Sequence, residues 1–417
     1  MGKSKIKVGV DIGNTKTSIA VGRTDRQGNL VILGIETTAT LGLKEGRIDN
    51  LDNIVTLLKS TIFALEDNIE QNVHEVYLAV SGEMVSSVNH SEVKFFADKR
   101  TAVTEADSHE IAQKAFKRKH SDRLTCLHQT TRYYKLDDRK CLVAPIGKLG
   151  QKLEVHVHLV YAEKEAIETL RQLFEELGIR VVDFVYAPVA DTLLLISDEQ
   201  KMAGTLLIDM GGYHTDYVLF SEGAIELTGS VPIGGAAITE DIQAMLRLPL
   251  KRAEEIKLDY AIASENYPLE TNELHIESED IYLQSQPMVI DHQLLNEVTY
   301  YRALEIFEML QEEIPPALLA QITGGVQLTG GASQLREIGQ VATEVFSMEV
   351  YLANGASYDQ DMDLRTIDFP TYECPENSTV LGLLQYATFV DELEVLEKES
   401  IFTGWISKLF PSSPKRG

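Results

Sequence analysis

Short apolar segments alternate along the chain with longer amphipathic ones, a pattern that is typical of α/β proteins. Residues 8–22, VGVDIGNTKTSIAVG, place apolar positions on both sides of a polar turn, and they predict two strands joined at Gly13 and Asn14. A further strand is predicted at 30–36. Apolar residues at helical spacing predict a helix at 53–69 with one buried side, formed by Ile54, Leu57, Leu58, Thr61, Ile62 and Leu65.

The strand-turn-strand pattern recurs at 206–220, LLIDMGGYHTDYVLF. Aligning the two copies pairs residues of the same type, Asp209 with Asp11, Gly211 with Gly13, and Thr215 with Thr17. Backbone N–H groups converge at such turns and suit phosphate, and a carboxylate at the strand end can hold Mg²⁺ through water. Strand-glycine-strand hairpins without function are common, but the duplication predicts two phosphate hairpins that grip one nucleotide between two α/β lobes.

Between about 84 and 163 the pattern changes to alternating, half-exposed strands around one helix, which predicts a small β-rich insert. Thr104 and Asp107 approximate a capping box at the start of that helix. His156 and His158 lie two positions apart on a strand. We favour solvated or core histidines over metal ligands, because no third ligand is spaced to join them.

Two strand-glycine-glycine-helix units follow the second hairpin. In VPIGGAAITEDIQAML the predicted helix cap is Thr239, and in GVQLTGGASQLREI it is Ser333. Residues 267–289 are polar and acidic and predict a peripheral hairpin, and a long helix is predicted from about 294 to 313.

The end of the chain differs from the rest. Residues 391–399, DELEVLEKE, form an acidic segment that we interpret as a flexible linker. Beyond it, six apolar residues share one side of a helix: Ile401, Phe402, Trp405, Ile406, Leu409 and Phe410. Residues 398–417 also hold four basic residues and one acidic residue. Such a segment predicts an interfacial membrane anchor, and the alternative is a helix that docks on the protein itself or on a partner.

Composition narrows the possible functions. The net charge of −26 over 417 residues argues against nucleic acid as a partner. Cys126, Cys141 and Cys374 lack the spacing of metal ligands, so disulfides and a zinc site are not expected and a reducing cytoplasm fits. No segment approaches the roughly 20 apolar residues of a membrane-spanning helix.

Five motifs resemble those of the actin, Hsp70 and sugar-kinase superfamily of nucleotide-binding proteins. They are the phosphate motifs DIGNTKT and DMGGYHTD, the adenosine motif LTGGAS, and the connecting helices VYAPVADTLLL and STVLGLLQYA. Within this superfamily the chain looks like the FtsA family of bacterial cell-division proteins. Three features carry that resemblance: VYLAVSG before the insert, VPIGGAAITEDI followed by AEEIK, and an amphipathic tail behind a linker.

The resemblance implies an α/β, actin-like two-lobed fold with duplicated phosphate-binding β-hairpins and a small β-rich insert subdomain. The implied first lobe core comprises 1–83 with 164–200 and 376–390, and the insert comprises 84–163. The implied second lobe has a core of 201–233 with 296–375 and an outer subdomain of 234–295. A linker at 391–399 and a membrane-targeting tail at 400–417 complete the chain.

The resemblance also implies ATP with Mg²⁺ between the lobes. The implied phosphate contacts are Gly13, Asn14, Thr15 and Lys16 on one side and Asp209, Gly211 and Gly212 on the other, with Asp11 and Asp209 holding Mg²⁺ through water. The implied nucleotide border and adenosine contacts are Gly234, Gly235, Glu254, Lys257, Gly330 and Gly331. Asp216 matches the acid that positions the attacking water in relatives that hydrolyse ATP.

Relatives in the FtsA family imply polymerisation into protofilaments, attachment to the cytoplasmic face of the cell membrane at the division septum, and contact with other division proteins. They also imply binding of the acidic C-terminal tail of the tubulin-like FtsZ. Candidate contacts for that tail are Arg247, Lys251 and Arg252, which are alternatively plain surface charges.

One departure concerns the second phosphate motif, where Tyr213 and His214 replace the family's third glycine and threonine. A glycine offers an approachable N–H group, so Tyr213 either narrows the phosphate pocket or turns outward. We therefore expect ATP binding with slow or absent hydrolysis.

Two alternative functions share both hairpins. A pilus-assembly-type ATP-binding adaptor works with an inner-membrane partner peptide, and the tail around Trp405 disfavours it. A small-molecule, sugar-type kinase needs a catalytic carboxylate in the insert and has no use for an amphipathic tail.

Overall fold

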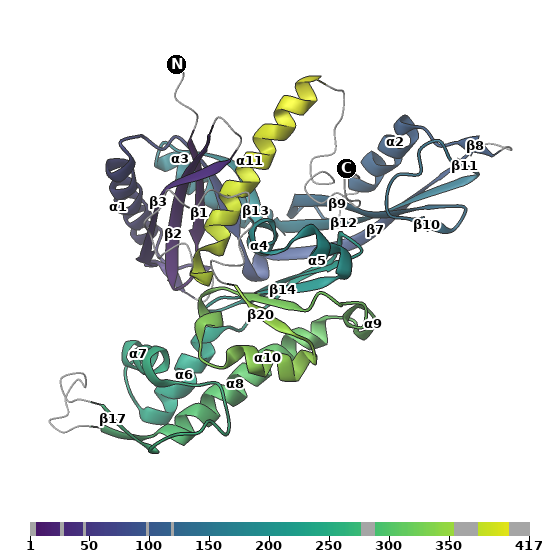
Figure 1. Cartoon of the computed structure of the whole chain (residues 1–417). Helices are drawn as coiled ribbons and strands as arrows, with labels where there is room; N and C mark the ends of the chain where they lie inside the picture. Colours follow the sequence, from purple (N-terminus) through teal and green to yellow (C-terminus); the bar gives the residue numbers. More distant parts are fainter. Residues whose placement is uncertain are drawn as a thin grey trace.

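The computed structural model describes residues 6–25, 29–44, 47–96, 100–117, 121–276, 288–353 and 374–399, with the backbone alone for 392–399. The predicted membrane tail lies outside these residues. Figure 1 shows the first lobe at the upper left, the insert at the upper right and the second lobe below them.

The first lobe is built on a mixed sheet. Within the described residues it has five strands in the order β13-β6-β1-β2-β3, with the bounds Arg180–Tyr186, Glu75–Val80, Ile6–Ile12, Lys16–Thr24 and Leu30–Ala39. Strand β1 is antiparallel to β2 and parallel to β6. Helix α1 (Leu51–Ile69) buries the six residues that the sequence predicts, which confirms its apolar side. Helix α3 (Lys164–Glu176) packs beside β13.

The second lobe repeats this arrangement. Within the described residues its main sheet has the order β16-β15-β14-β19-β20, with the bounds Ala224–Val231, Thr215–Ser221, Thr205–Met210, Val326–Thr329 and Val350–Leu352. Strand β14 is antiparallel to β15 and parallel to β19, as β1 is to β2 and β6. The registers also correspond, since Asp11 lies opposite Ser18 and Asp209 lies opposite Asp216. The predicted duplication is therefore confirmed.

Helices and a hairpin complete the second lobe. The helices are α5 (Asp198–Ala203), α6 (Gly235–Leu246), α7 (Leu250–Tyr260), α8 (His292–Glu313), α9 (Pro316–Leu319) and α10 (Ile338–Phe346). Strands β17 (Glu273–Ile276) and β18 (Met288–Asp291) pair antiparallel within the segment that predicts a peripheral hairpin. Figure 1 places this hairpin at the far end of the lobe.

The insert is a β-sheet with one helix on it. Its strands in the described residues follow the order β10-β9-β12-β7, with the bounds Arg139–Cys141, Leu124–Leu136, Lys152–Glu163 and Val85–Phe95. Helix α2 (Glu105–Phe116) begins at the predicted Thr104–Asp107 capping box. Two pairs of short strands complete these units. In the first lobe, β4 (Leu43–Lys44) pairs with β5 (Arg47–Ile48). In the insert, β8 (Thr101–Ala102) pairs with β11 (Leu149–Gly150).

The insert also packs on the second lobe. The Ser87 hydroxyl donates to the Thr228 carbonyl at 2.8 Å, and the Asn89 amide donates to the Glu226 carbonyl at 2.9 Å. Strand β16, the outermost strand of the second sheet, is thereby covered along its free edge. His158 is fully buried at this contact and bonds both Asn89 and Thr228, so it is a core histidine as predicted.

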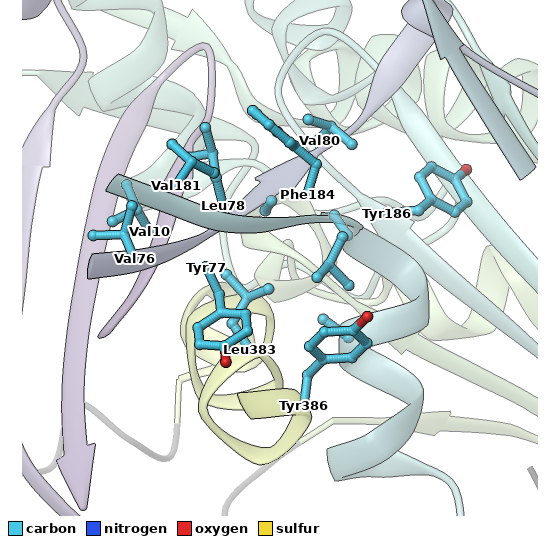
Figure 2. Close-up of a cluster of buried hydrophobic side chains, with 14 of the residues drawn as sticks. Val10, Val76, Tyr77, Leu78, Val80, Val181, Phe184, Tyr186, Leu383 and Tyr386 are labelled. Carbon is cyan, nitrogen blue, oxygen red and sulfur yellow. The ribbon is translucent and has the colours of Figure 1, made fainter. Parts of the chain in front are cut away.

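Helices α4 (Ala187–Leu195) and α11 (Ser378–Glu399) lie between the two main sheets. They touch through their backbones, since a Cβ at Gly382 would lie 2.2 Å from the Ala190 carbonyl oxygen. Strand β1 approaches α11 just as closely, because a Cβ at Gly9 would lie 2.8 Å from the Leu383 Cβ. Figure 2 shows Leu383 and Tyr386 of α11 facing the apolar side chains of the first sheet.

Three predicted features of helix ends are wrong. Helix α6 begins at Gly235 after an N-cap at Gly234, so Thr239 lies inside the helix and donates to the Gly235 carbonyl. Ser333 lies in a short 3₁₀ turn, and α10 begins only at Ile338. Helix α11 continues through 391–399, where the sequence predicts a flexible linker. Glutamate, leucine and lysine are strong helix formers, so this acidic segment extends the preceding helix.

Asp191 is buried between α4 and α11. Its side chain is fully buried, and among the described residues neither carboxylate oxygen has a hydrogen-bond partner in good geometry. Burial raises the pKa of this carboxyl to about 8, although the nearby Ser378 and Thr379 hydroxyls act in the opposite direction. Asp191 is therefore a neutral acid at neutral pH.

The helix contact gives a first prediction. Gly382→Ala should destabilise the protein by about 2–3 kcal/mol, because its Cβ would overlap the α4 backbone. Gly339→Ala in α10 is the matched control, because the added Cβ would lie at an ordinary contact distance of 3.5 Å from Leu352. This substitution should leave the stability unchanged or raise it slightly. The midpoint of urea unfolding measures both. Equal effects of the two substitutions would contradict a backbone contact at Gly382.

A second prediction concerns pH. The pKa of Asp191 rises from 3.8 to about 8 on folding, so the stability that its proton provides is present at low pH and is lost as pH rises through this window. The free energy of unfolding of the wild type, compared with that of Asp191→Asn, should fall by about 1 kcal/mol per pH unit up to about pH 8. Above that pH the difference between the two proteins should stay constant. Urea unfolding of both proteins at about pH 5, 7 and 9 tests this. Parallel pH profiles would refute the assignment.

Candidate functional site

The two duplicated hairpin turns meet across the gap between the lobes. Thr15 follows β1 and Gly212 follows β14. A Cβ at Gly212 would lie 2.6 Å from the Thr15 Cγ2, so the absence of a side chain lets the turns touch. The Gly211 N–H closes the second turn by donating to the His214 carbonyl at 3.0 Å. The turns therefore form opposite walls of one site.

A cavity of about 2020 Å³ lies between these walls. It is lined by nearly all the residues predicted for nucleotide binding: Asp11, Gly13, Asn14, Thr15, Lys16, Asp209, Gly211, Gly212, Asp216, Gly235, Glu254, Lys257, Gly330 and Gly331. Gly234 lies behind the second turn, where a Cβ would be 2.5 Å from the Gly211 carbonyl oxygen. Gly330 has a φ of +88°, and a Cβ there would lie 2.3 Å from the Asp209 Oδ1, so only glycine fits.

Buried carboxylates concentrate negative charge at the phosphate turns. The pKa of Asp11 is raised to about 6, chiefly by burial, while the nearby Lys16 ammonium lowers it and the Asp216 carboxylate raises it to a smaller extent. The pKa of Asp209 is raised well above its ordinary range by burial and then by its aspartate neighbours, Asp191 first. Because burial disfavours ionisation of these carboxyl groups, a ligand or ion that brings positive charge would stabilise their ionised forms.

Lys16 is the cation of the first phosphate turn. Its Nζ donates to the Glu376 backbone carbonyl at 2.7 Å and lies 3.4 Å from the Glu376 Oε2. Burial lowers the pKa of Lys16, and the neighbouring carboxylates of Glu376 and Asp11 oppose that shift. Sequence reasoning missed Glu376, because its contact with Lys16 joins residues 360 positions apart.

Asp216 lies at a junction of the two lobes and the insert. Its Oδ1 accepts the N–H of Gly82 at 2.9 Å and lies 3.2 Å from the Tyr186 hydroxyl, which also reaches the Gly229 carbonyl at 2.5 Å. Gly82 opens the 3₁₀ turn η1 (Gly82–Met84) that leads into the insert. One carboxylate oxygen of Asp216 is therefore engaged by the protein itself.

Tyr213 and His214, the two departures from the family pattern, both line the cavity. The imidazole of His214 lies against Gly82, whose φ is +74° and where a Cβ would be 3.0 Å from ring atoms. Both residues therefore belong to the wall of the second turn, and His214 also packs on the residue that leads into the insert.

Lys257, one of the residues predicted to contact adenosine, is held by contacts within its own lobe. Its Nζ donates to the Thr239 hydroxyl at 2.9 Å and to the Gly235 carbonyl at 3.2 Å, and it pairs with the Glu254 carboxylate at 2.7 Å. These contacts join α7 to the first turn of α6, where the sequence places the glycine pair that borders the nucleotide.

The three candidate partner residues differ in exposure. Arg247, which ends α6 with a left-handed backbone, and Lys251 on α7 are exposed. The side chain of Arg252 is only 13% exposed and its Nη1 pairs with the Glu255 carboxylate at 2.6 Å. Of the three candidates, only Arg247 and Lys251 are therefore exposed to solvent, and Lys251 also lines the cavity.

The predicted membrane residues, Ile401 to Phe410, lie outside the described residues. Among the helices that are described, none is long and apolar enough to cross a bilayer.

Known proteins resemble this chain in sequence over almost its whole length. A family model described as "Cell division protein FtsA" matches residues 206–382, and one described as "SHS2 domain inserted in FTSA" matches 82–161, the predicted insert. FtsA of Pseudomonas aeruginosa is 29% identical over 92% of this chain and 89% of its own. FtsA of Escherichia coli K12 is 24% identical over 97% of this chain and 96% of its own.

Solved structures show the same fold at low sequence identity. The PilM-PilN type IV pilus biogenesis complex matches 92% of this chain and 98% of its own with a TM-score of 0.64 at 15% identity. MreB5 of Spiroplasma citri bound to AMPPNP matches 95% of this chain and 99% of its own with a TM-score of 0.54 at 16% identity. The predicted actin-like, two-lobed α/β fold with a small β-rich insert is thus confirmed, and the insert is the segment that matches the SHS2 model. The two family models together span more than half of the chain, and it belongs to the FtsA family of actin-like cell-division proteins.

Proposed function

We propose that this protein binds ATP with Mg²⁺ between its lobes, polymerises, and tethers the FtsZ ring to the cytoplasmic face of the cell membrane at the division septum. The observation that carries the proposal is the contact between the two duplicated turns, Thr15 against Gly212, at a cavity lined by both. MreB5, which shares the fold, has been solved with AMPPNP and with ADP.

The residues present fit a nucleotide polyphosphate. Gly331 lines the cavity, and a Cβ there would have no atom within 4 Å, so a ligand can approach its backbone. Lys16 supplies a cation at the first turn. The volume of about 2020 Å³ exceeds the roughly 300–1,000 Å³ of ordinary ligand pockets, as expected for an open cleft between lobes.

The donor set also fits Mg²⁺ held partly by the nucleotide. No three histidine, cysteine, aspartate or glutamate side chains in the described part of the chain converge into a metal site. Mg²⁺ commonly keeps several waters and takes one or two carboxylates plus substrate phosphates. Asp11 and Asp209, whose pKa values are raised chiefly by burial, would hold the ion through water once ionised, and the ion would neutralise phosphate charge.

Two features support slow hydrolysis. Asp216, the proposed water-positioning acid, already accepts the Gly82 N–H with one oxygen. Tyr213 and His214 occupy cavity wall that a glycine and a threonine would leave open. Binding of ATP, more than its hydrolysis, would therefore control polymerisation.

Turnover tests this part of the proposal. Purified protein should bind ATP and hydrolyse it far more slowly than about 1 s⁻¹, the low end of ordinary enzyme rates. The double substitution Tyr213→Gly with His214→Thr should raise turnover several-fold, and Tyr301→Ala, an exposed position on α8, should leave it unchanged. Wild-type turnover near or above about 1 s⁻¹ would overturn the switch interpretation.

Membrane attachment rests on the apolar face at 401–410 and its basic flank, because no helix described in the structure can span a bilayer. Helix α11 supports the assignment, since it starts at the cavity and carries the backbone to Glu399, immediately before the tail. We expect the full chain to co-sediment with anionic vesicles and a truncation after Glu397 to lose this binding.

Trp405→Glu should also weaken vesicle binding by at least tenfold, whereas Phe63→Glu, at a 70% exposed position on α1, should not. If the truncated chain binds vesicles as well as the full chain, the tail is not the anchor. FtsZ added to the mixture should follow the full chain onto vesicles. Charge reversal at Arg247 and Lys251 should keep vesicle binding but reduce FtsZ recruitment, which separates the two proposed surfaces.

The pilus-assembly alternative has one structural observation in its favour, the TM-score of 0.64 to the PilM-PilN complex. At 15% identity this likeness shows the fold alone. The sequence matches extend through the insert and the second lobe and carry cell-division descriptions, so the division function is the better supported of the two.

A further inference from the structure

Glu376 occupies an unusual place beside the phosphate turns. It belongs to the 3₁₀ turn η7 (Pro375–Asn377), which comes directly before α11 and lines the cavity. Its carboxylate Oε2 lies 3.4 Å from the Lys16 Nζ and accepts the Gln334 amide at 3.2 Å. A negatively charged group thus faces the same space as the residues proposed to hold negatively charged phosphates.

Lys16 is also held by a contact that does not involve this carboxylate. The shorter contact of its Nζ, 2.7 Å, is to the backbone carbonyl of Glu376. Turn η7 is itself fixed by β19, because the Thr329 hydroxyl lies 3.1 Å from the Pro375 carbonyl and 3.0 Å from the Ser378 hydroxyl. Replacing the Glu376 side chain therefore leaves the lysine in place and removes only a charge.

We propose that Glu376 is a specificity-determining residue that restrains the affinity of the cavity for phosphate groups. The inference rests on the proposed nucleotide function of the cavity. The carboxylate offsets the positive charge of Lys16 and repels the phosphate groups of an incoming ligand. The resulting loss of affinity should grow with the number of phosphate groups on the ligand. The side chains of Lys16 and Glu376 are only 21% and 31% exposed, so solvent screens these interactions incompletely.

The opposite role, in which Glu376 positions Lys16 for binding, makes the opposite prediction. A positioning carboxylate would raise phosphate affinity, and its loss would weaken binding. A restraining carboxylate lowers phosphate affinity, and its loss strengthens binding. The backbone contact at 2.7 Å favours restraint, because it positions the lysine without help from the side chain.

The test measures binding of ATP, ADP and adenosine to the full chain in the presence of Mg²⁺. Glu376→Gln keeps the size of the side chain and should lower the Kd for ATP by about threefold to tenfold. The gain should be smaller for ADP, and the Kd for adenosine should change by less than about twofold. Glu376→Asp restores the charge and should return ATP affinity toward the wild-type value.

Glu308→Gln on the exposed side of α8 makes the same change in net charge away from the cavity, and it should leave all three affinities unchanged. Unchanged or weaker ATP binding by Glu376→Gln would overturn the inference. An equal gain for adenosine would also overturn it, because the effect would then not act on phosphates. Wild-type protein that binds no nucleotide would instead refute the proposed function itself. Comparing the urea midpoints of the variants separates these outcomes from a loss of folding.

Discussion

The backbone contact between α4 and α11 fixes the distance between the two lobes. Gly382 lets α11 touch α4, and Gly9 lets strand β1 touch α11, so the strand that carries Asp11 is held by two contacts in which a methyl group would not fit. The turn contact between Thr15 and Gly212 depends on this spacing, because a helix layer thicker by one side chain would separate the sheets. A few glycines therefore decide whether the duplicated hairpins form one site.

Electrostatics set the second constraint. The chain carries a net charge of −26, so long-range attraction cannot bring a polyphosphate to this site. Affinity must come from short-range contacts with turn N–H groups, Lys16 and a bound cation. The raised pKa values of Asp11 and Asp209 show that ionisation of these buried carboxyl groups is unfavourable. A Mg²⁺ ion that enters with the nucleotide would stabilise their ionised forms.

The sequence predicted those parts of the structure that depend on local pattern. The paired hairpins, the apolar side of α1 and the Thr104–Asp107 capping box all follow from residue spacing over a few turns. Prediction failed where neighbours distant in the chain decide the outcome. Thr239 had the right chemistry for a cap, but the glycines before it extend α6. The neighbours of Asp191 and Glu376 come from parts of the chain that are distant in sequence and meet only in the folded protein. No local sequence pattern indicates such positions.

The insert is joined to the phosphate site by polar contacts as well as by the chain. Gly82, where the insert departs, donates to Asp216 in the second phosphate hairpin, and the insert strands hold the free edge of β16. Strand β16 is the neighbour of β15, which carries Asp216. A displacement of the second hairpin would therefore strain both the root of the insert and the sheet edge on which it packs. The Asp216 carboxylate is therefore part of a structural joint between the second hairpin and the insert, an arrangement that fits the proposed binding of ATP with slow hydrolysis.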